Sequence, residues 1–185
     1  MIAVWGFDAG ALDRVRGEGA VVRHALGDQG RYGAGEPFDV LVTATVEDPS
    51  GLAVGDLGRR VWAWTIDERR PRVGDEECAV TMVALMRRLS ELTPEEFAAH
   101  WTTRHTPIAL AHHAGLHDYT QNLVVRALTP GAEEVDGVAE LGFRTRDEFE
   151  SQFYDSDDGR RAIGADVRRF MAGPGPDTTL LGPPR

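Results

Sequence analysis

The sequence has little cysteine and a deficit of positive charge. Its 185 residues include one cysteine, Cys78, which excludes an intrachain disulfide framework and a cysteine-rich zinc site. Lysine and arginine together number 20 against 30 aspartate and glutamate residues, so the formal net charge is −10. This acidic balance argues against nucleic acid or an anionic membrane as the main partner, because binding to either relies on clustered basic side chains.

Long apolar runs and targeting signals are also missing. No run of about 18 apolar residues occurs, so we expect no membrane-spanning helix. The first residues lack the basic stretch and the apolar stretch that mark a secretory signal, and we therefore expect a cytoplasmic protein. The chain does contain 42% hydrophobic and 27% charged residues, which is ordinary for a folded globular protein.

The first half predicts short strands separated by turns. The predicted strands cover residues 2–7, 20–26, 38–46 and 61–66, with short helical segments near residues 11–15 and 52–57. The charged segment 68–77 contains Pro71 and Gly74 and favours a linker. We therefore divide the chain into residues 1–70, a linker at 71–78, and residues 79–185.

The second half predicts the same order of elements in a fuller form. After a strand at 79–86, a helix begins with Thr93 as N-cap, Pro94 at the first helical position and Glu96 completing a capping box. Further strands are predicted at 119–128, 135–143 and 178–181, and helices at 146–154 and 159–170. The order βαββαβ thus occurs twice, and two such units can pair their sheets into one closed barrel with helices outside.

Three segments of the second half resemble the EthD domain family. They are LTPEEFAAHWTTRHTPIA (92–109), AGLHDYTQN (114–122) and DGVAELGF (136–143). The resemblance covers about residues 79–181 and implies the dimeric α/β-barrel superfamily. The fold class it implies is α+β, with two ferredoxin-like βαββαβ repeats pairing their antiparallel sheets into one α/β barrel. The first half would then be a diverged copy, making the chain a monomer with an internal pseudo-dimer, or a homodimer.

The resemblance also implies a function. Members of the family and near relatives include methylmuconolactone methylisomerase, polyketide cyclases, and dehydratases or decarboxylases of aromatic polyketides. By this analogy the chain is a cofactor-independent lyase or isomerase of secondary metabolism, acting on an aromatic, polyketide-like or lactone substrate in an apolar pocket. The alternatives are a cofactor-free monooxygenase and a non-catalytic protein that binds a small ligand. Haem binding also occurs in the superfamily.

Histidines gather where the predicted helix of the second half lies. Four of the six fall between positions 100 and 113, namely His100, His105, His112 and His113, and imidazole exchanges protons near neutral pH. Helical periodicity places Phe97, Trp101 and Ile108 on the inward face, with His105 and His112 on its flank. Pro107 removes a helical hydrogen bond, so we expect an irregular turn beside His105.

The resemblance assigns roles to two residues, and strand geometry suggests two more. His105 and Tyr119 match the histidine of a His-x-Pro element and the tyrosine of a Gly-Leu-x-x-Tyr element, which line the active cleft of the methylisomerase. Gln121 shares a strand face with Tyr119. Glu140 lies among apolar residues, where it can orient an imidazole or pair with an arginine such as Arg126 or Arg144. We expect these four as catalytic residues.

Five further residues are expected to contact substrate: Trp101, His112, Trp62, Trp64 and Gly142. Trp62 and Trp64 point the same way along one strand, where they can stack on a planar substrate or fill the barrel core. Gly142 replaces a large aromatic residue common in the family, which would reshape the pocket. The histidines show no His-Glu-x-x-His arrangement, and the glycines of residues 27–35 do not open a phosphate loop, so we expect neither a metal nor a nucleotide.

Overall fold

The computed structural model describes residues 1–8, 20–29, 36–49, 54, 56–173 and 177–184. In this part of the chain, eight strands close into a barrel in the order β1-β3-β2-β8-β5-β7-β6-β4, and every strand is antiparallel to its neighbours. The strands are β1 (Ile2–Phe7), β2 (Val21–Ala25), β3 (Val40–Thr43), β4 (Gly58–Arg72), β5 (Val80–Met86), β6 (Asp118–Ala127), β7 (Gly137–Phe143) and β8 (Asp177–Pro184).

Each half of the chain contributes four strands in the same spatial order. The first half contributes β4-β1-β3-β2 and the second contributes β8-β5-β7-β6, so in both halves the fourth strand lies beside the first, followed by the third and the second. This is the ferredoxin-like order. The two sheets join at two seams, β4 with β6 and β2 with β8. The predicted fold class is therefore confirmed.

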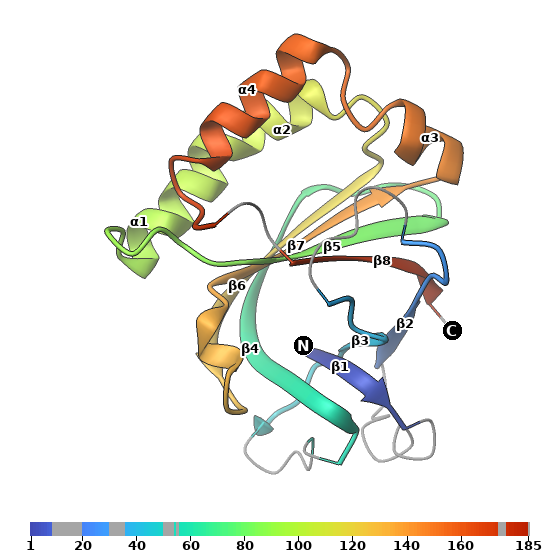
Figure 1. Cartoon of the computed structure of the whole chain (residues 1–185), viewed down its shortest axis with the longest axis vertical. Helices are drawn as coiled ribbons and strands as arrows, with labels where there is room; N and C mark the ends of the chain where they lie inside the picture. The colour runs from blue at the N-terminus through green and yellow to red at the C-terminus, as the bar shows by residue number, and fades with distance from the viewer. Residues whose placement is uncertain (9–19, 30–35, 50–53, 55, 174–176, 185) are drawn as a thin grey trace.

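The helices of the second half pack on the outer face of its sheet (Figure 1). They are α1 (Pro94–Ala99), a π-helical segment (His100–His105), α2 (Thr106–His112), α3 (Arg146–Ser151) and α4 (Asp157–Val167), and a 3-10 turn covers Ala132–Glu134. The capping box is present, since the Thr93 hydroxyl accepts from the Glu96 N–H at 3.2 Å and the Glu96 carboxylate accepts from the Thr93 N–H at 2.8 Å. None of the described helices is long and apolar enough to cross a membrane.

The irregular turn expected beside Pro107 is a π-helical segment. It ends immediately before α2, and the N–H of Thr106 donates to the carbonyl of Trp101, five residues back. Pro107 has no N–H and cannot continue the ordinary helical bonding pattern. His105 therefore lies at the junction of two helical geometries, a position at which π-helical turns often coincide with functional sites.

Strand β4 is longer than the sequence indicated. Residues 68–72, expected in a linker, belong to this strand and pair with β6 as far as Arg72 opposite Tyr119. Pro71 is accommodated because the register shifts between Arg69 and Arg72, so no ladder bond from its nitrogen is needed. The predicted helix near residues 11–15 lies outside the described residues, as do residues 52, 53 and 55 of the segment 52–57.

Side-chain alternation along the strands creates two separate layers in the second half. One face of β5, β6 and β7 packs against the helices, in a core that includes Phe97, Trp101 and Phe170. The opposite face points into the barrel, where Val83 and Val138 pack with aromatic residues of the first half. A residue on these strands therefore belongs either to the helix side or to the barrel interior.

Candidate functional site

His105 lies at the C-terminal end of the π-helical segment and is only 7% exposed. Its Nδ1 is 2.9 Å from Oδ2 of Asp166, a residue of α4 that is 4% exposed. The other oxygen of Asp166, Oδ1, is 3.0 Å from Nε2 of His100. An ionised carboxylate only accepts hydrogen bonds, so Nδ1 of His105 and Nε2 of His100 each carry a hydrogen. Nε2 of His105 then bears the free lone pair.

The environment of His105 favours the neutral imidazole. Burial lowers its pKa below the ordinary value, while the hydrogen bond and the charge of Asp166 oppose this effect without reversing it. Near neutral pH the ring is therefore unprotonated at Nε2. A neutral imidazole held in one orientation by a carboxylate is suited to act as a general base.

Tyr119 lies on the helix-facing side of β6 in a closed polar network. Its hydroxyl oxygen accepts from Trp101 Nε1 at 3.0 Å and from Gln121 Nε2 at 3.1 Å. Gln121 Nε2 also donates to the hydroxyl of Thr106 at 3.0 Å, which connects this network to the residue after His105. Burial raises the pKa of Tyr119 to about 12, so the phenol stays protonated and its own hydrogen is available to a further acceptor.

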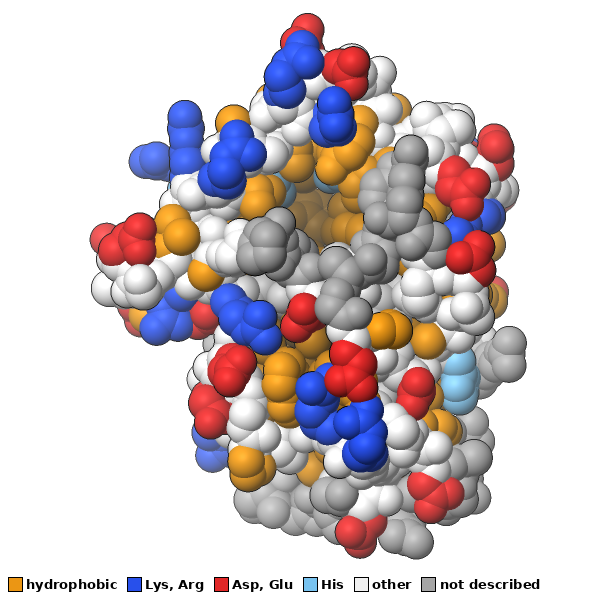
Figure 2. Space-filling model, viewed as in Figure 1, with side chains coloured by type: hydrophobic (Ala, Val, Ile, Leu, Met, Phe, Trp, Pro, Cys, Tyr) orange, Lys and Arg blue, Asp and Glu red, His pale blue; other side chains and the backbone are white. Residues whose placement is uncertain are grey.

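The helix side of the sheet also has an apolar recess. Figure 2 shows it between the helices and the sheet, lined mainly by hydrophobic side chains, with histidine atoms in its wall. Phe170 forms part of the surroundings, since the ring of His100 stacks on it at 4.8 Å and the ring of His105 lies 5.2 Å from it. The structure thus brings three of the predicted residues, His105, Tyr119 and Gln121, together with Trp101 on one side of the sheet.

The structure corrects the expected partners of Glu140. It lies on β7 opposite Thr120 and therefore faces the barrel interior, on the other side of the sheet from Tyr119. Its carboxylate pairs with Arg23 at 3.1 Å and accepts from Asn122 Nδ2 at 2.9 Å. It neither orients an imidazole nor pairs with Arg126 or Arg144, because strand alternation sends the side chain to the opposite layer.

The predicted substrate contacts also divide between locations. Gly142 lines the barrel interior, where an added Cβ would lie 2.6 Å from Cys78 Sγ, so the missing side chain makes room for this thiol. Trp62 and Trp64 are buried in the barrel core, with Trp62 packed edge-on against Trp5 at 5.1 Å. His112 pairs with Asp155 at 3.0 Å near the surface. Of the five expected contacts, Trp101 alone is in the hydrogen-bonded network with Tyr119.

The sequence did not lead us to expect the contacts of Asp166 with His105 and His100. Asp166 lies 61 residues after His105, so their contact depends on how α4 packs against the π-helical segment. A signal was available, since Asp166 follows Ile163 by three residues and precedes Phe170 by four, which places it on the buried face of α4. An acidic residue on such a face requires a partner.

Among the residues that the structure describes, no group of three or more His, Cys, Asp and Glu side chains has the geometry of a metal site.

Residues 89–174 match the sequence profile of the EthD domain. This match covers a little less than half of the chain. The match confirms the resemblance inferred from the three segments, and it includes His105, Tyr119 and Asp166. The matched segment thus includes the complete helix-side cluster described above.

A crystal structure described as that of an "anthrone oxidase-like protein" shares the fold. It aligns over 98% of this chain and 88% of its own length, with a TM-score of 0.60 and 12% sequence identity. None of the curated proteins matches the chain significantly. Together the EthD domain and the fold support a small-molecule enzyme or binding protein of the α/β-barrel superfamily.

Proposed function

We propose that this chain is a cofactor-independent enzyme that transfers protons on a small aromatic, polyketide-like or lactone substrate, with His105 as the general base. The observation that carries the proposal is the buried pair of His105 and Asp166. Asp166 fixes the ring and its tautomer, and burial keeps the ring neutral, as the lowered pKa of His105 indicates. The apolar recess supports a largely apolar substrate.

The chemistry follows from the groups present. Nε2 of His105 takes a proton from a carbon next to a carbonyl group, and the resulting imidazolium is stabilised by Asp166. The electron pair moves onto the carbonyl oxygen, and Tyr119 donates its hydroxyl hydrogen to the enolate or phenolate that forms. Trp101 and Gln121 hold the phenol in place. Returning the proton to a different atom completes an isomerisation. In a dehydration, a hydroxyl group beta to the carbonyl takes the proton from the His105 imidazolium and leaves as water, and the enolate collapses to the unsaturated product.

A second candidate is a cofactor-free oxygenase. The name of the structural neighbour, an anthrone oxidase-like protein, favours it. The first step would be the same deprotonation at His105, after which the carbanion reacts with molecular oxygen instead of being reprotonated. The two candidates differ in whether oxygen is consumed.

The test uses anthrone as a model carbon acid. In D₂O without oxygen, NMR measures the exchange of its ring methylene protons with and without the protein, and an oxygen electrode follows the same mixture in air. We expect the wild-type chain to accelerate exchange, and His105→Gln to lower this acceleration by at least about 100-fold, the usual contribution of a general base. Asp166→Asn should lower it as well, because the ring loses its fixed tautomer.

His24→Gln is the matched control, since this histidine lies on β2 in the other half of the chain and should leave the exchange rate unchanged. Oxygen uptake dependent on His105 would favour the oxygenase. Saturable binding of anthrone without accelerated exchange would instead support a binding protein. Wild-type exchange rates in His105→Gln would refute the assigned base.

A further inference from the structure

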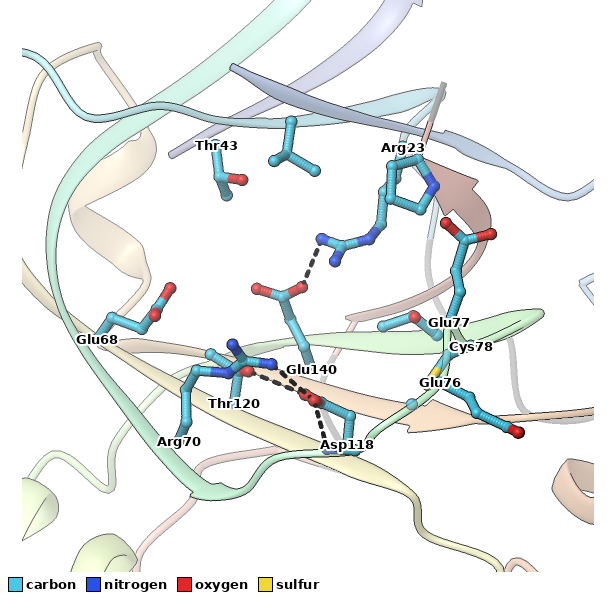
Figure 3. Close-up of a pocket in the computed structure, with 15 residues that line it drawn as sticks. Arg23, Thr43, Glu68, Arg70, Glu76, Glu77, Cys78, Asp118, Thr120 and Glu140 are labelled. Atoms are coloured by element: carbon cyan, nitrogen blue, oxygen red, sulfur yellow. Dashed lines mark hydrogen bonds and ion pairs between the residues drawn. The ribbon is translucent and has the colours of Figure 1, made fainter. Parts of the chain in front are cut away.

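The barrel encloses a second cavity that the helix-side cluster does not use. It has a volume of about 330 Å³ and lies between β2, β4, β5, β6 and β7. Figure 3 shows that Arg23, Glu68 and Glu140 point into it from three different strands, with Arg70 and Asp118 below them. Its walls come from both halves of the chain, whereas the helix-side cluster lies within the second half.

Carboxylates outnumber arginines in the lining of this cavity. Five acidic residues line it, namely Glu68, Glu76, Glu77, Asp118 and Glu140, against Arg23 and Arg70. Arg23 pairs with Glu140 at 3.1 Å and Arg70 with Asp118 at 2.7 Å. Glu68 has no such ion pair among the described residues, so two formal pairs leave an excess of negative charge.

The electrostatics of Glu140 reflect this excess. Burial raises the pKa of Glu140, and the charges of Glu68 and Asp118 add to the effect while Arg23 opposes it. Glu68 is therefore close enough to Glu140 for the two carboxylates to repel each other. A cation placed between them would relieve this repulsion.

A buried acceptor next to Glu140 also has no donor. The side chain of Asn122 is 0% exposed, and its Nδ2 donates to the carbonyl of Val138 at 3.1 Å and to Glu140 at 2.9 Å. Both partners are acceptors, which fixes the orientation of the amide. Its Oδ1 then has no partner among the described residues. An unpaired buried acceptor is costly, and this atom adds to the excess of acceptors around Glu140.

A larger, mostly apolar cavity adjoins the polar one. Its volume is about 550 Å³, and it shares Val21, Thr43 and Glu68 with the polar cavity. Trp64 and Ile66 form part of its apolar lining. A ligand that occupies both cavities must carry a polar head and an apolar body.

We propose that the barrel interior binds a small organic cation with a primary ammonium head and an apolar chain. The ammonium group lies between Glu68 and Glu140, and the chain runs along Ile66 and Trp64. An organic cation fits better than a metal ion, because the described residues contain no group of three or more His, Cys, Asp and Glu side chains that could hold a metal.

The test compares three probes of equal chain length by isothermal titration calorimetry on the full chain: octylammonium, octan-1-ol and octanoate. We expect saturable binding of one octylammonium per chain, with octan-1-ol and octanoate at least about tenfold weaker. Glu68→Gln and Glu140→Gln should each weaken octylammonium binding about tenfold. Glu68 is exposed, so its variant folds even if Glu140→Gln, which leaves Arg23 without its carboxylate, does not.

Asp67→Asn is the matched control, because the adjacent side chain points out of the barrel and its variant should bind octylammonium like the wild type. The proposal is overturned if octan-1-ol binds as tightly as octylammonium, if octanoate binds more tightly, or if octylammonium does not bind. It is also overturned if Glu68→Gln binds octylammonium like the wild type. Binding lost in His105→Gln but kept in Glu68→Gln would place the probe at the helix-side cluster and overturn it as well. Because exchange of anthrone protons does not involve the barrel cavity, either proposal can fail without the other.

Discussion

Burial determines the protonation state of the ionisable residues on both sides of the sheet. Burial lowers the pKa of His105 and His113, and raises that of Tyr119 to about 12. On the helix side this produces a neutral base next to a protonated phenol, a combination suited to moving a proton near neutral pH. In the barrel, Cys78 follows the same rule, because burial and the nearby carboxylates raise its pKa to about 11 and keep the thiol protonated.

His113 gives a residue-scale prediction for stability against pH. Burial lowers its pKa to about 4 in the folded chain, against 6.5 for the unperturbed group. The unfolded chain therefore binds a proton at higher pH than the folded chain, and the contribution of His113 to stability is complete above about pH 6.5 and lost as pH falls toward 4. We expect a loss of about 2 kcal/mol by about pH 5.

Urea unfolding of the wild type and His113→Gln at about pH 7.5 and pH 5 measures this loss. The variant should lose about 2 kcal/mol less than the wild type between the two pH values, whatever its stability at the higher one. Equal losses in both proteins would contradict the assignment.

At the scale of elements, the helix layer is positioned by close contact with β7. Gly137, the first residue of β7, faces Trp101, and an added Cβ would lie 2.6 Å from Trp101 Cζ3. The ring reaches the sheet closely enough to donate to Tyr119 because Gly137 has no side chain. The π-helical segment and the glycine therefore act together to hold Trp101 over β6.

Gly137→Ala should consequently destabilise the fold by about 1–3 kcal/mol, the usual cost of overpacking. Displacement of Trp101 should also change the tryptophan fluorescence spectrum relative to the wild type. Gly164→Ala in α4 is the control, since its added Cβ meets nothing closer than 3.6 Å and alanine favours a helix. That variant should be as stable as the wild type or more stable by up to about 1 kcal/mol in urea. A Gly137→Ala chain of wild-type stability would refute the contact.

At the scale of the whole molecule, the two halves share one barrel. β4 pairs with β6 and β2 pairs with β8, so neither four-stranded sheet has a free edge at these seams. The interior core mixes Trp5 and Trp62 of the first half with Val83 and Val138 of the second. The seams and the shared core make separate unfolding of the halves costly.

We therefore expect a single unfolding transition. In Trp101→Phe, the tryptophans left are Trp5, Trp62 and Trp64, all in the first half, so fluorescence reports that half alone. Far-UV circular dichroism reports the helices, which among the described residues belong mainly to the second half. The two signals should give the same urea midpoint. A fluorescence midpoint clearly below the dichroism midpoint would show that the halves unfold independently.

Local structure and much of the helix-side cluster can be predicted from the amino-acid sequence. Thr93, Pro94 and Glu96 mark the helix start through neighbouring atoms, and strand alternation placed Gln121 beside Tyr119. Pro107 predicted an irregular turn, because the missing N–H is a local property. The family segments located His105, since they lie within one continuous stretch of chain.

Contacts between side chains that are distant in the sequence depend on the tertiary structure. Asp166 joins His105 across 61 residues and Arg23 joins Glu140 across 117, and both contacts depend on the packing of elements that no local pattern specifies. The side of the sheet on which Glu140 lies depends on the register of β7 with β6. The cavity around Glu140 forms because the barrel closes at the two seams. A residue's conformation depends on its neighbours in the chain, whereas its partners depend on how the whole barrel closes.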